Sequence, residues 1–270
     1  MRALVRRPGP RLADGLLTHR DRQPIDLARA TRQWVDYVDA LRGNGWEIIE
    51  VPPADDCPDA AFIEDTMVAF DDLVVISLPG APSRQPETAA VAVALAGLGY
   101  ERLSIEPPGT LDGGDVLKVG NTVYAGLGGR TNAAGVAQLA THLGTRGATV
   151  VAVPCTKVLH LKSAVTALPD GTIVGWPDAV DDPSIFPTFL ATPEESGAHV
   201  VLLGDDRLLM AADCPQSAEM YRALGYHPVE VDIGEFQKLE GCVTCLSVRL
   251  RGPMRRVAGE SVEQGARRGA

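Results

Sequence analysis

The sequence predicts an α/β fold in which repeated units close into a ring, that is, an α/β propeller. One observation is a recurring hairpin, two apolar stretches joined by a tight polar turn, at residues 66–78, 115–127, 164–176 and 200–212. The turns, centred near Asp71, Gly120, Asp170 and Asp205, carry the Gly, Asn and Asp residues that tight turns require. The second observation is a helix that ends in glycine and is followed by a strand, at residues 41–52, 95–107, 143–154 and 222–233.

The two patterns together define one unit of a hairpin, a helix and a further strand, repeated four to five times without linkers. The first helix is expected to start at Pro24 and to bury one face, formed by Leu27, Trp34, Val35, Val38 and Leu41. Repeats that each leave a sheet edge exposed favour a closed ring over a doubly wound sheet. We expect a single catalytic domain over residues 1–251 and a flexible tail over 252–270.

Composition limits the class of partner. The chain has 270 residues, 45% of them hydrophobic, and a formal net charge of −10. The acidic balance disfavours nucleic acid and suits a cationic small molecule. The first ten residues lack the apolar core of a signal peptide, and no apolar run approaches the roughly 20 residues that span a bilayer. Five cysteines, an odd number, do not describe a disulfide framework. We therefore expect a cytoplasmic protein with free thiols and no membrane partner.

Cys245 lies in a stretch, residues 242–250, that is interpreted as a strand. With Cys242 it forms a CxxC pair, which suggests redox chemistry. Thioredoxin-type pairs begin a helix, however, and a zinc site would need further Cys or His ligands nearby. A buried structural cysteine is about as plausible from residue type alone.

Several polar residues recur at similar places in the repeat. Glu64 and Asp65 interrupt an apolar stretch that is interpreted as a strand, with Asp59 just before it; buried carboxylates there would need a cation, and solvent exposure is the alternative. His160 follows a strand and a short loop, and either Asp112 or Asp115 could orient its imidazole or simply form a turn. Arg84 and Arg130 lie in loops, where each could clamp a carboxylate or face solvent. A ring would bring these residues into one central pocket as nucleophile, acid and base, cation binder and carboxylate clamp.

Six segments carry a family resemblance: PDAAFIEDT (58–66), PGAPSR (79–84), LDGGDVL (111–117), GLGGRTN (126–132), LHLKS (159–163) and TCLSV (244–248). In this order and near this spacing they resemble the dimethylarginine dimethylaminohydrolases, guanidine-modifying enzymes of the five-bladed α/β-propeller (pentein) fold. The resemblance covers residues 1–251. It implies that Cys245 is the nucleophile, His160 the general acid and base, and Asp112 the residue that orients His160.

The resemblance also implies a substrate-binding set. Asp65 and Glu64 would hold the guanidinium group, Asp59 the ammonium end, and Arg84 and Arg130 the α-carboxylate; Leu17 would belong to a mobile lid and Leu239 would offer a backbone contact. The implied reaction is hydrolysis of Nω-methylated L-arginine to L-citrulline and dimethylamine or methylamine, through a covalent thiouronium intermediate. It implies no cofactor and no metal, and a monomer or a homodimer.

The nearest alternative is an arginine deiminase, a family that places a second guanidinium-binding aspartate two residues after the catalytic histidine. Lys162 stands at that position here. A lysine cannot accept hydrogen bonds from an unmethylated guanidinium nitrogen and would repel the cation, so a methylated substrate is favoured. An amidinotransferase shares the thiol chemistry and also stays open, as does a protein that uses Cys242 and Cys245 as a disulfide switch without turnover.

Overall fold

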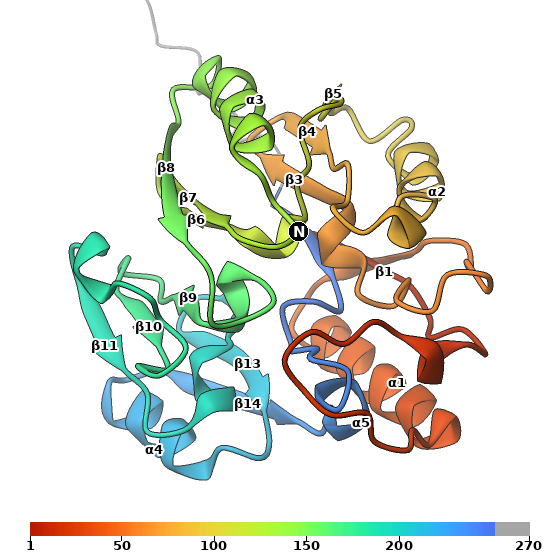
Figure 1. The fold of residues 1–270 in the computed structure, drawn as a ribbon. Helices are drawn as coiled ribbons and strands as arrows, with labels where there is room; N and C mark the ends of the chain where they lie inside the picture. The colour runs from red at the N-terminus through yellow and green to blue at the C-terminus, as the bar shows by residue number, and fades with distance from the viewer. Residues whose placement is uncertain (252–270) are drawn as a thin grey trace, which may run out of the picture.

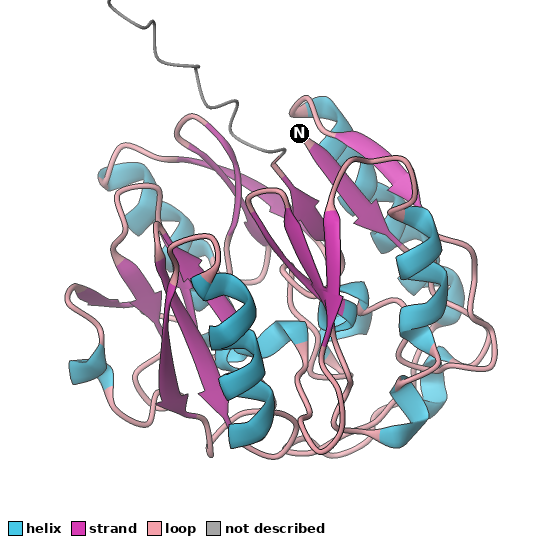
Figure 2. Cartoon of the chain, turned by 90° about the horizontal axis from the view of Figure 1, so that it is seen from above, coloured by secondary structure: helices cyan, strands magenta, loops and turns pink. Residues whose placement is uncertain are grey.

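The computed structural model describes residues 1–251, so the predicted tail at 252–270 lies outside the described residues. Five three-stranded sheets form a ring around a central axis, with the longer helices on the outside (Figure 1). In each sheet the central strand pairs antiparallel with one neighbour and parallel with the other. In the view turned by 90°, the helices lie on the periphery of the strands, and loops connect the elements at both ends of the ring (Figure 2).

Each sheet is one blade of the propeller. The first blade holds β15 (Val248–Leu250), β1 (Arg2–Val5), α1 (Leu27–Gly43) and β2 (Glu47–Glu50), and the second holds β3 (Met67–Phe70), β4 (Leu73–Ile76), α2 (Glu87–Ala94) and β5 (Glu101–Ser104). The third blade holds β6 (Val116–Val119), β7 (Thr122–Leu127), α3 (Ala133–Gly144) and β8 (Thr149–Pro154), and the fourth holds β9 (Val165–Ala167), β10 (Ile173–Gly175) and β11 (Phe189–Ala191). The fifth blade holds β12 (Val201–Gly204), β13 (Arg207–Ala211), α4 (Pro215–Ala223) and β14 (His227–Val231), and the short α5 (Gly234–Gln237) follows it.

All four predicted hairpins are present, as β3–β4, β6–β7, β9–β10 and β12–β13. Their turns need a positive φ, which Asp71 and Asp205 adopt at 50° and Gly120 at 56°. Asp and Gly tolerate this left-handed region better than most residues, so the turn residues fix the hairpins.

The first blade closes the ring. The central strand β1 pairs antiparallel with β15, with Ala3 opposite Arg249, and parallel with β2, with Ala3 opposite Ile48. The two ends of the described chain therefore lie in one sheet, and the predicted ring of repeated units is confirmed.

Two expectations for the first helix are wrong, and one blade departs from the repeated unit. Helix α1 begins at Leu27 rather than Pro24, because the Asp26 side chain accepts the backbone N–H of Arg29 and caps the helix there. Its buried face includes Tyr37, whereas Val35 is 36% exposed. The fourth blade has no α-helix between β10 and β11; a short 3-10 helix, Pro183–Ile185, takes its place in a segment where prolines recur.

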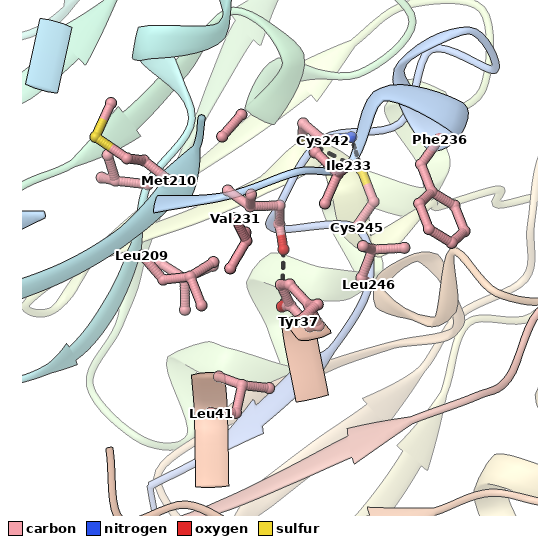
Figure 3. Close-up of a cluster of buried hydrophobic side chains, with 14 of the residues drawn as sticks. Tyr37, Leu41, Leu209, Met210, Val231, Ile233, Phe236, Cys242, Cys245 and Leu246 are labelled. Atoms are coloured by element: carbon pink, nitrogen blue, oxygen red, sulfur yellow. Dashed lines mark hydrogen bonds between the residues drawn. The ribbon is translucent and has the colours of Figure 1, made fainter. Parts of the chain in front are cut away.

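The largest apolar cluster lies between α1 and the fifth blade. Tyr37 and Leu41 of α1 pack with Leu209, Val231, Phe236 and Leu246 (Figure 3). Cys242 and Cys245 belong to the same cluster. No helix within residues 1–251 is long and apolar enough to cross a membrane.

Candidate active site

Five of the residues singled out in the sequence lie just before the first strand of a blade, in short turns rather than in strands: Glu64, Asp65, Asp112, His160 and Cys245. Glu64 and Asp65 are on the 3-10 helix Ile63–Thr66, which leads into β3. Cys245 is in a turn over residues 243–246 that precedes β15. The strand expected over 242–250 therefore begins only at Val248, and the strand expected around Asp65 begins only at Met67. Both expectations are wrong, because the backbone forms a turn before each strand, and this turn directs the side chains of Asp65 and Cys245 into one pocket.

These turns meet at a small pocket at one end of the axis. The pocket is lined by Leu16, Asp59, Phe62, Asp65, Arg84, Arg130, Leu159, His160, Leu239, Glu240, Gly241 and Cys245. Seven of the predicted site residues belong to this lining. The other three, Asp112, Glu64 and Leu17, lie outside it, each in a different way.

Asp112 lies behind His160. Its Oδ2 is 3.1 Å from His160 Nε2, and its Oδ1 accepts the backbone N–H of Gly80 at 2.8 Å. Both side chains are almost completely buried. The glycines of the LDGGD segment make this contact possible, because a Cβ on Gly114 would lie 2.7 Å from His160 Nδ1. The imidazole is thus held from one side by a carboxylate and packed against bare backbone on the other.

Asp115, the other acid of that segment, organises backbone instead. Its carboxylate accepts the Thr131 hydroxyl at 2.6 Å and the backbone N–H of Leu161 at 2.9 Å. Burial raises its pKa to about 6 against the opposing effect of His160. Of the two acids that the sequence left open, Asp112 is therefore the one in contact with the imidazole.

Three carboxylates make the surroundings of His160 strongly acidic. Burial alone would lower the pKa of His160, but Asp65, Asp115 and Asp112 together raise it to about 9. Asp65 Oδ1 is 3.6 Å from His160 Nδ1. The imidazole is therefore protonated at neutral pH in this closed state and can act as a proton donor.

The raised pKa predicts a pH-dependent stability. His160 binds its proton more tightly in the folded than in the unfolded protein, so its stabilising effect is complete below about pH 6.5 and is lost as pH rises toward 9. We expect His160→Asn to be less stable than the wild type at pH 6, with the difference in free energy of unfolding shrinking by up to about 3 kcal/mol by pH 9. Urea denaturation of both proteins across this range measures it; a constant difference would contradict the assigned charge.

Asp65 and Arg84 form a buried ion pair. Arg84 Nη1 is 2.5 Å from Asp65 Oδ2, while its Nε and Nη2 donate to Glu87 at 3.1 and 2.9 Å. Burial would raise the pKa of Asp65, but His160 and Arg84 lower it to about 2. Arg84 also donates to the carbonyls of Asp59 and Phe62. Its donors are used inside the protein, so Arg84 fixes Asp65 and the pocket wall.

Arg130 differs from Arg84 because one of its N–H donors makes no hydrogen bond within residues 1–251. Its Nη1 lies 3.8 Å from Asp112 Oδ2 and, among the described residues, is a buried nitrogen without a hydrogen-bond partner. Asp59, on the same lining, accepts the backbone N–H of Leu16 at 3.0 and 3.2 Å. The Arg130 guanidinium, with one N–H donor that makes no hydrogen bond to the described part of the chain, and the Asp59 carboxylate thus line the same small pocket.

Glu64 and Lys162 turn away from the pocket. Lys162 Nζ is 2.7 Å from Glu64 Oε1, and Arg249 also contacts that oxygen. All three line a different cavity of about 500 Å³. The structure thus does not bring Glu64 to the pocket of Cys245, and the expectation that the Lys162 charge stands beside a bound guanidinium is wrong, because the two side chains satisfy each other.

The loop over residues 15–20 covers the pocket. Leu16 rather than Leu17 lines it, and Leu17 packs against the apolar cluster near α1. Glu240, which sequence reasoning did not single out, holds this loop: its carboxylate accepts the backbone N–H groups of Thr18, His19 and Arg20. Glu240 has a φ of 61°, which is rare for a residue with a side chain. The sequence signal for it was only its place beside Leu239 and Gly241.

Cys245 contacts a second thiol. Its Sγ is 3.3 Å from Cys242 Sγ and accepts the backbone N–H of Cys242 at 3.5 Å. The hydrogen bond with Cys242, burial and nearby Glu64 and Asp65 raise the pKa of the Cys245 thiol. All five cysteines are free, as expected. A cation beside a buried thiol of this kind stabilises the thiolate, which is the nucleophilic form.

Known proteins are similar to this chain in sequence and in fold. Residues 53–209 match the family model of arginine deiminase. The chain is 62% identical over 250 residues to an N(G),N(G)-dimethylarginine dimethylaminohydrolase of Streptomyces coelicolor, covering 93% of this chain and 97% of that one. It is 33% identical to the Pseudomonas aeruginosa protein of the same name, covering 91% and 98%.

Solved structures agree. A dimethylarginine dimethylaminohydrolase from Pseudomonas aeruginosa in complex with citrulline superposes with a TM-score of 0.86 at 32% identity, covering 92% of this chain and 98% of that chain. An adduct of a dimethylarginine dimethylaminohydrolase with S-methyl-L-thiocitrulline has a TM-score of 0.85 at 31% identity, covering 92% and 99%. The five-bladed α/β propeller is thereby confirmed. By sequence and by structure, this chain belongs to the dimethylarginine dimethylaminohydrolase family.

Proposed function

We propose that this chain hydrolyses Nω-methylated L-arginine to L-citrulline and a methylamine, with residues 1–251 as its catalytic domain. The observation that carries the proposal is the pocket in which a thiol, a charged imidazole, three carboxylates and two guanidinium groups converge, one of which, Arg130, has an N–H donor that makes no hydrogen bond with the described residues. Its near relative, 62% identical over almost the whole chain, bears the name of this activity. The enzyme is expected to be cytoplasmic and a monomer or a homodimer.

Cys245 is the nucleophile in this proposal. A substrate guanidinium beside Asp65 would stabilise the Cys245 thiolate and lower the thiol pKa from its raised value. The thiolate attacks the guanidinium carbon and forms a C–S bond. His160, which is protonated and fixed by Asp112, gives its proton to the departing methylamine, and the C–N bond breaks. A thiouronium remains on Cys245.

The second half of the reaction uses the same two residues. The neutral His160 takes a proton from water, and the hydroxide attacks the thiouronium carbon. The C–S bond then breaks, which regenerates Cys245 and leaves the urea group of citrulline. Asp112 keeps the imidazole in one orientation for both proton transfers, because its other oxygen is anchored on the Gly80 amide.

The remaining residues hold the two ends of an arginine. Asp59 accepts from the α-ammonium group, and Arg130 donates to the α-carboxylate. Arg84 acts through Asp65, which it fixes at 2.5 Å. Leu239 offers a backbone contact beside Gly241, and the loop with Leu16 and Leu17 opens to admit substrate and closes under the hold of Glu240. Glu64 supports the pocket from behind, through its backbone N–H to the carbonyl of Cys245.

The test is a screen of arginine, monomethylarginine, asymmetric dimethylarginine and hydroxyarginine, with citrulline as the measured product. Asp65 lines the pocket as a carboxylate, together with the apolar Phe62 and Leu159. Glu64 and Lys162 line the other cavity, so Glu64 offers no acceptor to a substrate in the pocket. An unmethylated nitrogen leaves donors unpaired there, at about 1–3 kcal/mol each. We expect a kcat/KM for methylated arginine at least about tenfold above that for arginine. Equal or faster hydrolysis of arginine would instead make the chain a deiminase.

Arg130→Ala is expected to raise KM by about ten- to hundredfold and to change kcat much less. The arginine donates to a carboxylate that takes no part in the bond changes, and such a charge-assisted contact contributes about 1.5–3 kcal/mol. Steady-state kinetics with dimethylarginine measure both constants. Arg84→Ala is the contrast, because it leaves Asp65 and Glu87 without their partner and should lower thermal stability as well. A pure loss of kcat would place Arg130 in the chemistry.

A further inference from the structure

We propose that Cys242 and Cys245 form a modification site at which a hydroperoxide converts the two thiols into a disulfide. Their sulfur atoms lie 3.3 Å apart, and Figure 3 shows the two side chains next to each other at the edge of the apolar cluster. The second cysteine of the pair is the proposed nucleophile. The disulfide would therefore block the active site, a consequence that rests on the proposed function, whereas the disulfide itself does not.

The backbone already has the shape that a disulfide needs. The N–H of Cys245 donates to the carbonyl of Cys242 at 3.1 Å, which makes the two cysteines the first and last residues of a tight turn. The ends of such a turn have Cα atoms within about 7 Å, close to the range of about 4.4–6.8 Å found in disulfides. This turn, and not the start of a helix, brings the pair together.

Three contacts hold the turn in place. Tyr37 donates its hydroxyl to the carbonyl of Val243 at 2.8 Å, and Arg249 donates to the carbonyl of Thr244 at 3.0 Å. The backbone N–H of Glu64 donates to the carbonyl of Cys245 at 3.1 Å. The sulfurs must then approach from 3.3 Å to about 2.05 Å by side-chain movement, without refolding of the backbone.

A small oxidant can reach the pair from two sides. Cys245 lines the catalytic pocket, and Cys242 lines an adjoining cavity of about 620 Å³ that shares Glu240 and Gly241 with it. The hydrogen bond from Cys245 lowers the pKa of Cys242, which favours a thiolate there. Burial raises the pKa of the other three thiols, Cys57, Cys155 and Cys214. Thiolate character, which controls reaction with peroxide, is thus concentrated at Cys242.

The chemistry balances with hydrogen peroxide as the oxidant. The Cys242 thiolate attacks one oxygen, the O–O bond breaks, and a sulfenic acid forms on Cys242 with release of hydroxide. The sulfur of Cys245 then attacks the sulfenic sulfur, the S–S bond forms, and the hydroxyl leaves with the thiol proton as water. The two sulfurs lose two electrons and the peroxide becomes two waters. A thiol reductant reverses the change.

Peptide mass measurement tests the site independently of activity. Trypsin releases Leu239–Arg249, which contains both cysteines and none of the other three. After peroxide treatment and digestion without reductant, this peptide should be lighter by about 2 Da, the loss of two hydrogens that a disulfide entails. Citrulline formation should fall in parallel and return with dithiothreitol. Oxygen addition to this peptide instead of hydrogen loss, or no change, would overturn the proposal.

Two variants sharpen the test. Cys242→Ser should make citrulline before oxidation, but peroxide should then inactivate it in a way that dithiothreitol does not reverse, because Cys245 proceeds to sulfinic acid. Cys155→Ser, which removes a thiol outside the pair, should behave as the wild type. Recovery of oxidised Cys242→Ser with dithiothreitol to the wild-type level would show that the reversible change does not need Cys242, and would overturn the disulfide. A lighter peptide from a protein that makes no citrulline would refute the proposed function and leave the site standing.

Discussion

Replacing Cys245 with serine is expected to reduce citrulline formation from dimethylarginine at least about ten-thousandfold, to the limit of detection. A serine hydroxyl is not ionised at neutral pH, whereas a thiol beside a bound guanidinium can be, and only the ionised form attacks the carbon. Single-turnover and steady-state assays of citrulline measure the loss. The variant should still bind the substrate, which a thermal shift by dimethylarginine would report.

Cys242→Ser is the matched control for that result, since it removes the neighbouring thiol from the same turn. It should keep most of the turnover, because the serine hydroxyl can replace the thiol in its 3.2 Å contact with Thr244. Equal loss of activity in both variants would contradict the assignment of Cys245 as the single nucleophile and favour a pair that reacts as a unit.

The repeat was visible in the sequence because its turns depend on local chemistry. Asp71, Gly120 and Asp205 are residues that tolerate a positive φ, so each of these hairpins can be predicted from its local sequence alone. The third strand of the fourth blade, β11, was not visible, because no glycine-ended helix precedes it. The closure of the ring by β1 and β15 joins residues almost 250 positions apart, which no local pattern contains.

The turns that carry the site were misjudged for a physical reason. A run of apolar residues around Asp65, or around Cys245, has the composition of a strand, and a single 3-10 turn is too short to leave a period of its own. Tertiary contacts determine the conformation of these turns instead. The backbone N–H of Glu64 donates to the carbonyl of Cys245, so each turn is shaped by the other, from the neighbouring blade.

Which side chain faces the pocket could not be predicted either. Glu64 and Asp65 are neighbours in sequence, yet one meets Lys162 and Arg249 while the other meets Arg84 and His160. A turn sends adjacent side chains in opposite directions, and the direction depends on which cations the other blades supply. The family resemblance indicates the segments that carry the site, but only the structure shows which of their side chains line the pocket of Cys245 and which line the other cavity.

Asp112→Asn is expected to lower kcat by about a hundred- to ten-thousandfold with little change in KM. Asp112 accepts from two donors, the Gly80 amide at 2.8 Å and His160 Nε2 at 3.1 Å. An asparagine oxygen can keep the Gly80 contact, but its NH₂ group then faces Nε2 and requires that nitrogen to be an acceptor. His160 would be held neutral, with its proton on Nδ1, and its pKa would fall. A neutral imidazole is a much weaker acid than an imidazolium, and a protonated Nδ1 cannot take a proton from water, so both proton transfers would slow.

Kinetics and stability together separate this effect from misfolding. The base limb of the pH profile of kcat/KM should move to lower pH in Asp112→Asn. Asp115→Asn is the matched control: it disturbs the contacts with Thr131 and Leu161 and should lower the melting temperature. It also removes a charge that raises the pKa of His160, but the His160 contact with Asp112 stays in place, so kcat should fall much less than in Asp112→Asn. If Asp112→Asn kept the wild-type kcat while Asp115→Asn lost it, the orienting carboxylate would be Asp115, and the role assigned to the 3.1 Å contact between Asp112 and His160 Nε2 would have to be abandoned.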